Sequence, residues 1–100
     1  MDIHVTARHC KLTDDEHKAA VDAALHFEKF HDNIIRIDAI LDENTHKSCE
    51  YTVRVDGHTI VARETTGEFT KAIHDAAEKV VRQLRKLKTR MEAPRETIRE

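Results

Sequence analysis

The dipeptide Asp56-Gly57 separates two runs of residues in which apolar and polar side chains alternate. Both residues tolerate the positive φ of a type I′ turn, which joins two strands through a two-residue loop. Alternation at every second position is typical of a half-buried β-strand. The apolar members of the two runs are Cys49, Tyr51, Val53, Val55, Ile60 and Ala62. The sequence therefore predicts a tight hairpin, with its second strand at about residues 58–64.

Two further strands are expected nearer the N-terminus. Residues 2–9 alternate in the same way, with Ile3, Val5 and Ala7 on the apolar side. Residues 34–41 also alternate, and their apolar members are Ile35, Ile37, Ala39 and Leu41. Residues 42–47 are polar, so they are expected to form a loop before the next strand.

A first helix is expected at about residues 14–31. Thr13 and Glu16 have the spacing of a capping box, in which each side chain bonds to the backbone N–H of the other residue. An apolar stripe at helical spacing consists of Ala20, Ala23, Ala24, Phe27 and Phe30. Val21 and Leu25 lie off this stripe, and they are either exposed or part of another contact.

A second, longer helix is expected at about residues 68–91. Apolar residues recur there at steps of three and four: Phe69, Ala72, Ile73, Ala76, Ala77, Val80, Leu84, Leu87 and Met91. Ala93-Pro94 should end regular structure, because a proline disfavours helical geometry in the residue before it. We expect residues 93–100 to form a short flexible C-terminal tail.

The element order β-α-β-β-β-α predicts an α+β fold with two helices packed on one face of a four-stranded, mostly antiparallel sheet. The first strand can lie beside the second strand or beside a later one. One hundred residues leave no room for a second core, so residues 1–92 are expected to form a single domain.

The charge of the chain is segregated. Residues 1–78 hold 9 basic and 16 acidic residues, whereas residues 79–90 hold six basic residues and no acidic one. These six are Lys79, Arg82, Arg85, Lys86, Lys88 and Arg90. On a helical wheel, Lys79, Arg82, Lys86 and Arg90 form a stripe roughly opposite the apolar stripe. Such asymmetry favours a local anionic partner, although chance clustering on a solvated helix face is the simpler alternative.

Several functional classes are disfavoured by the composition. Two glycines and no phosphate-binding or nucleophile-elbow motif argue against an enzyme, and no cofactor or small-molecule substrate is expected. The eight histidines include no HxH or HxxxH pair, so we expect no metal site. No segment is apolar for the length of a membrane span, and the N-terminus is not of the signal-peptide type. With only two cysteines, a reducing cytoplasmic location is the default.

Nucleic acid is the partner that best fits the basic stripe. Cations at steps of three and four residues form a line about 16 Å long, at 1.5 Å per residue, and a phosphate backbone presents charges at comparable intervals. The four aromatic residues all lie in apolar stripes, so we expect recognition of backbone and shape, as in structured RNA, rather than base stacking. The alternative is a protein-interaction adaptor that uses the basic helix against an acidic partner and Val21 and Leu25 as an apolar contact.

The chain resembles the family of ribosome hibernation promoting factors and ribosome-associated translation inhibitors over about 90 residues. The matching segments begin with Ile3-His4-Val5-Thr6 and Leu12-Thr13, and continue with the hairpin that ends in Ile60-Val61-Ala62. The most specific matching segments are Phe69-Thr70-Lys71-Ala72-Ile73 and residues 79–88. The second helix of the family has a similar hydrophobic-x-x-Ala-Ile start and a similar Lys-x-x-Arg-Gln-Leu-x-Lys run.

The resemblance implies a fold similar to double-stranded RNA-binding domains and binding in the tRNA and mRNA channel of the small ribosomal subunit. Translation would thereby be silenced in stress or stationary phase. It assigns ribosomal RNA contacts to Lys79, Arg82, Arg85, Lys86 and Lys88, with Arg90 as a weaker match. The first helix departs from the family, since Ala23 and His26 stand where members often carry basic residues. Long members carry a further C-terminal dimerisation domain, which these 100 residues do not include. The sequence does not determine the oligomeric state, and a monomer is the expectation.

Overall fold

The computed structural model describes residues 2–92, with side chains described as far as Leu87. The strands are β1 (Asp2–Arg8), β2 (Ile34–Asn44), β3 (His46–Val55) and β4 (His58–Thr66). The helices are α1 (Asp14–Phe27), a short 3₁₀ turn (Glu28–Phe30) and α2 (Phe69–Glu92). This confirms the predicted order and the α+β class. The flexible tail predicted for residues 93–100 lies outside the described residues.

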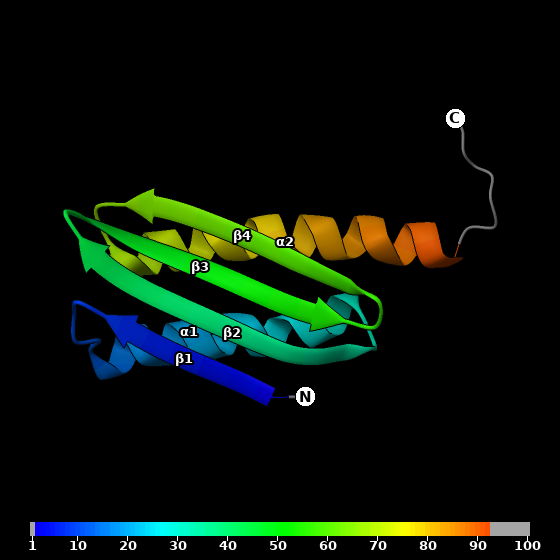
Figure 1. The fold of residues 1–100 in the computed structure, drawn as a ribbon, viewed down its shortest axis with the longest axis horizontal. Helices are drawn as coiled ribbons and strands as arrows, with labels where there is room; N and C mark the ends of the chain where they lie inside the picture. The colour runs from blue at the N-terminus through cyan, green and yellow to red at the C-terminus, as the bar shows by residue number, and fades with distance from the viewer. Residues whose placement is uncertain (1, 93–100) are drawn as a thin grey trace.

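The four strands form one sheet in the order β1-β2-β3-β4. β1 pairs with β2 in parallel, and the other two neighbouring pairs are antiparallel. Both helices lie on the same face of the sheet, with α1 behind β1 and β2 and α2 behind β3 and β4 (Figure 1). The N-terminal strand therefore lies beside the second strand, which is the first of the two positions that the sequence leaves open.

The core lies between the sheet and the two helices. Apolar residues of the predicted stripes are buried there, among them Phe27, Tyr51 and Leu84. Tyr51 is fully buried, its hydroxyl donates to the carbonyl oxygen of Ala20 at 2.8 Å, and its ring meets that of Phe27 edge-on. The small residues Ala20 and Ala24 are also fully buried. They let α1 lie close to the sheet.

The start of α1 is the capping box that the sequence predicts. The Glu16 backbone N–H donates to the Thr13 hydroxyl at 3.1 Å, and the Thr13 N–H donates to the Glu16 carboxylate at 2.9 Å. The helix ends at Phe27, and the 3₁₀ turn carries the chain to residue 30, one residue short of the predicted end. Leu25 is 49% exposed, as its position off the apolar stripe allows.

The prediction for Ile35 was wrong. Its side chain is 55% exposed, whereas Ile34 and Ile37 are buried. A register irregularity between Ile34 and Arg36 inserts one extra residue opposite β3. Because a bulge shifts every side chain beyond it to the other face, the alternation begins only after this point.

The loop predicted for residues 42–47 was also wrong. β2 continues to Asn44, β3 begins at His46, and these two residues are paired. Thr45 alone reverses the chain, with a φ of 80° that is rare for a β-branched residue. Polar side chains do not prevent strand pairing, because the bonds of the ladder come from the backbone.

The Asp56-Gly57 hairpin is confirmed, but its turn is not of type I′. Gly57 has a φ of 79°, and Asp56 is not among the residues with positive φ. A positive φ at the second central position alone is the requirement of a type II turn. β3 and β4 pair directly up to Val55 and His58.

Replacing Gly57 with valine is expected to lower the free energy of unfolding by about 1–3 kcal/mol, because a β-branched residue resists positive φ. A Cβ at this position would meet no atom within 4 Å, so the cost lies in the backbone conformation alone. Gly67→Ala is the matched control, since that glycine has open space and no positive φ. Urea unfolding measures both variants, and equal stability for Gly57→Val and the parent would contradict the prediction.

Candidate nucleic-acid interface

The basic residues of α2 that carry described side chains all reach the surface. Lys79, Arg82, Arg85 and Lys86 are exposed, while the apolar stripe of the same helix is buried against the sheet. The side chains of Lys88 and Arg90, the remaining two predicted contacts, lie outside the described part of the chain. The helix therefore separates a core face from a cationic face, as the wheel predicts.

Three of these cations line one groove between α2 and the start of β4. The groove has a volume of about 640 Å³, and Arg85 does not line it. Its lining residues are His58, Thr59, Ile60, Lys79, Arg82, Gln83, Lys86 and Leu87. Ile60 and Leu87 are nearly buried and supply the apolar part, whereas the remaining groups are polar or cationic. The basic stripe thus lies beside β4, the edge strand of the sheet, and shares the groove with residues of that strand.

Positive charge is concentrated in the second half of α2. In the first half, Lys71 pairs with Asp75 at 3.2 Å and His74 contacts Glu78 at 3.6 Å. In the described part of the chain, no acidic side chain lies within ion-pair distance of Arg82, Arg85 or Lys86. These three side chains are available to an anion from outside.

Lys79 differs from the other cations, because it forms an ion pair with Glu64 of β4. Sequence reasoning did not single out Glu64, Gln83, His58 or Thr59. The signal for Glu64 was its position, since it follows Ile60 and Ala62 at the same two-residue spacing and so faces the helix layer. His58 and Thr59 carried no such signal, because only the fold brings the hairpin tip beside α2. Gln83 lies within the run of residues 79–88 that resembles the family, between Arg82 and Leu84.

The first helix adds little positive charge. Lys18 pairs with Asp22 at 3.4 Å, Ala23 is partly buried, and the ring of His26 packs edge-on against Phe30 with centroids 5.2 Å apart. Lys29 is exposed in the 3₁₀ turn. Of the two helices, α2 therefore carries the cationic face.

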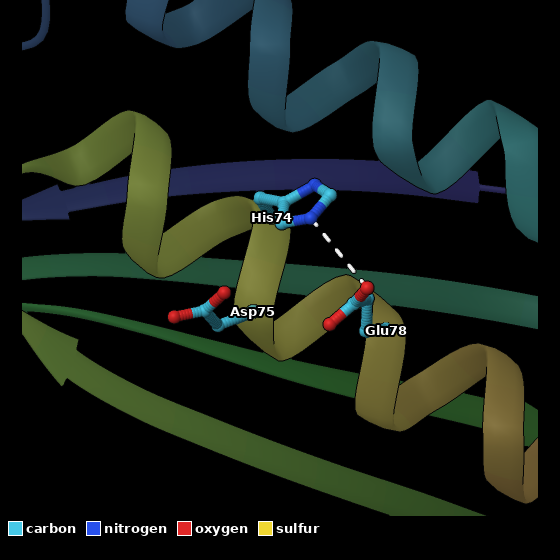
Figure 2. Close-up of side chains that lie close together, drawn as sticks. All are labelled: His74, Asp75 and Glu78. Carbon is cyan, nitrogen blue, oxygen red and sulfur yellow. Dashed lines mark ion pairs between the residues drawn. The ribbon is translucent and has the colours of Figure 1, made fainter.

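His74, Asp75 and Glu78 form the one described cluster with the donor set of a metal site (Figure 2). Their ligand atoms lie within 4.8 Å of one another, and with a single histidine the cluster has no HxH or HxxxH pair in the sequence. Asp75 is engaged by Lys71, Glu78 is engaged by His74, and the His74 and Glu78 side chains are more than half exposed. Since Lys71 already pairs with Asp75, and the His74 and Glu78 side chains are exposed to solvent, we assign no metal to this cluster.

Neither cysteine has the environment of a nucleophile. Burial raises the pKa of the Cys49 thiol to about 12, and a nearby Glu50 carboxylate adds to the effect. Partial burial, followed by the charges of Glu43 and Asp42, raises the pKa of Cys10. A reactive thiol needs the opposite shift, because the thiolate is the attacking species. Within residues 2–92, no helix combines the length and apolar character needed to cross a membrane.

The fold is shared with solved structures, among them the two that follow. The N-terminal domain of Protein Y from Thermus thermophilus has a TM-score of 0.78 and 17% identity, and the match covers 87% of this chain and 99% of that one. A ribosomal subunit interface protein from Coxiella burnetii also has a TM-score of 0.78, with 22% identity and coverage of 89% and 99%. At such identities the likeness establishes the fold. No curated protein matches the sequence significantly.

The family is established by the sequence itself. A family model described as Sigma 54 modulation protein / S30EA ribosomal protein matches residues 3–92. Apart from Asp2 at the start of β1, the match covers every described strand and helix, and it includes all six predicted basic positions. It confirms the resemblance to hibernation factors drawn from residues 79–88. The chain therefore belongs to the Sigma 54 modulation protein / S30EA ribosomal protein family.

Proposed function

We propose that the protein binds ribosomal RNA of the small ribosomal subunit, in the channel that tRNA and mRNA use, and thereby silences translation. It acts in the cytoplasm as a binding factor rather than an enzyme, without a cofactor or a small-molecule substrate. The proposed contacts are Lys79, Arg82, Arg85, Lys86, Lys88 and Arg90.

The observation that carries the proposal is the cationic face of α2 in a member of a ribosomal protein family. Arg82, Arg85 and Lys86 have no acidic partner among the described residues, and Arg82 and Lys86 line the groove between α2 and β4. Arginine clamps phosphate with two parallel N–H bonds, and lysine acts as a point charge. The cations are fixed on one helix, so the distances between them stay constant and can match phosphates of a structured RNA.

Co-sedimentation with isolated small ribosomal subunits at increasing salt tests the proposal. Each phosphate contact releases counterions, so several contacts should make the affinity fall steeply between about 50 and 200 mM salt. The logarithmic slope should be roughly −0.7 to −0.9 for each contact. Addition of the protein to a translation extract should inhibit synthesis over the same salt range.

The adaptor hypothesis predicts a different result. An acidic protein partner would leave the subunits unbound at every salt concentration, and the exposed Leu25 beside Val21 would then be the contact to test.

Binding to the subunits with the salt slope of a single contact would also contradict an interface formed by the whole basic face.

A further inference from the structure

Glu64 occupies an unusual place for a carboxylate. On β4 it follows Ile60 and Ala62 on the face of the sheet that α2 covers, and its side chain is 25% exposed. It lies across from the buried Cys49 of β3. The carboxylate is thus partly withdrawn from water, and Lys79 is the cation that pairs with it.

The same lysine lines the groove that we assign to RNA. Its ammonium therefore faces two anions, the carboxylate already in place and a phosphate arriving from outside. A lysine ammonium is a compact point charge, so a carboxylate in contact with it reduces its attraction for a second anion. Arg82 and Lys86 line the same groove and have no such competitor among the described residues.

We infer that Glu64 is an internal competitor for RNA phosphate at Lys79 and that it limits how tightly the groove binds. An RNA that contacts only Arg82 and Lys86 leaves the Lys79–Glu64 ion pair intact. An RNA that places a phosphodiester at the Lys79 end of the groove displaces the carboxylate and gains one contact. Glu64 thus lowers the affinity of RNA that places a phosphate at Lys79, and it leaves contacts with Arg82 and Lys86 unchanged.

This inference rests on the proposed function and is tested with the full chain and isolated small ribosomal subunits. Glu64→Gln removes the charge and keeps the size of the side chain. The variant is expected to bind about five- to eightfold more tightly at about 0.1 M salt, with a salt slope steeper by roughly 0.7–0.9, because Lys79 then meets phosphate with its full charge instead of a charge that Glu64 already neutralises. Fluorescence anisotropy of the labelled protein measures both quantities.

Glu78→Gln is the matched control, since it removes the same charge from α2 at a position outside the groove. Its affinity should rise by less than about twofold, because an exposed charge in water acts weakly at a distance. An equal rise for both variants would show a general charge effect and overturn the competitor role. In a Lys79→Gln background, Glu64→Gln should lose most of its gain, since the two residues are coupled.

The alternative role for Glu64 is to hold α2 against β4. In that case Glu64→Gln would lower the thermal midpoint and would leave the affinity unchanged or reduced, which would also overturn the inference. The proposed function is judged separately. If reversing the groove charges abolishes binding while Glu64→Gln behaves like the parent, the function stands and only the competitor role fails.

Discussion

Changing Lys79, Arg82 and Lys86 together to glutamate is expected to abolish co-sedimentation with small ribosomal subunits and to relieve inhibition of translation. All three side chains line the groove between α2 and β4. Loss of the Arg82 and Lys86 contacts alone weakens binding by roughly 25- to 60-fold at about 0.1 M salt, and loss of Lys79, which Glu64 already partly neutralises, weakens it further. The introduced carboxylates add repulsion to this loss.

Folding should change little in this triple variant. Arg82 and Lys86 are exposed on the surface of the helix, where substitutions usually shift the free energy of unfolding by less than about 0.5 kcal/mol. Lys79→Glu carries a further cost, because it leaves Glu64 beside a like charge. The double variant Arg82→Glu/Lys86→Glu avoids that cost, and it should still lose most of the binding.

A matched control reverses three exposed lysines outside the groove, namely Lys11, Lys18 and Lys71. This control has the same net charge as the groove variant, so it separates a local contact from overall repulsion. It should retain most of the binding and inhibition. If the groove variant binds like the parent, the basic face of α2 is only a solvated surface, and the adaptor that uses Val21 and Leu25 becomes the better hypothesis.

The parts of the fold that the sequence predicts well depend on short-range patterns. The capping box needs only Thr13 and Glu16, and the hairpin needs only Asp56-Gly57 between two alternating runs. The buried stripe of α2 follows from its own periodicity. In each case the residues that determine the structure lie close together in the sequence.

The errors occur where pairing with a distant strand decides the outcome. Ile35 is exposed because a bulge forms against β3, and no residue near it in the sequence signals that bulge. Residues 42–44 extend β2 because backbone partners are available on β3, although their side chains are polar. The type of the Asp56-Gly57 turn likewise depends on how β3 and β4 meet.

The candidate site shows the same division. Charge counting finds the cations of α2, because six of them fall within twelve residues without an acid. It does not find the groove, which requires the hairpin tip with His58 and Thr59 to lie against the helix. Nor does it find the pair between Lys79 and Glu64, since these residues come from different elements. The cations of the interface can thus be found from residues close together in the sequence. The groove and the Lys79–Glu64 pair depend on tertiary contacts between α2 and β4.

Tyr51→Ala should produce the opposite pattern to the groove variants, with a large loss of stability and no intrinsic loss of RNA affinity. The ring is fully buried, meets Phe27 edge-on with centroids 5.1 Å apart, and its hydroxyl bonds to Ala20. Truncating a buried aromatic side chain to alanine costs about 3–5 kcal/mol, which corresponds to a fall of roughly 12–30 °C in the thermal midpoint of a domain this size.

Tyr51→Phe keeps the ring and removes only the hydroxyl, so it should cost about 0.5–1.5 kcal/mol. Differential scanning calorimetry measures both changes, and anisotropy at a temperature where each variant is folded measures affinity for the small subunit. Parent-like affinity of folded Tyr51→Ala is the expected result, because no atom of Tyr51 lines the groove. A thermal midpoint unchanged by Tyr51→Ala would contradict the packing of α1 on the sheet. A loss of affinity in Tyr51→Phe at full folding would show that the Ala20 bond positions the RNA-binding face, and not only the core.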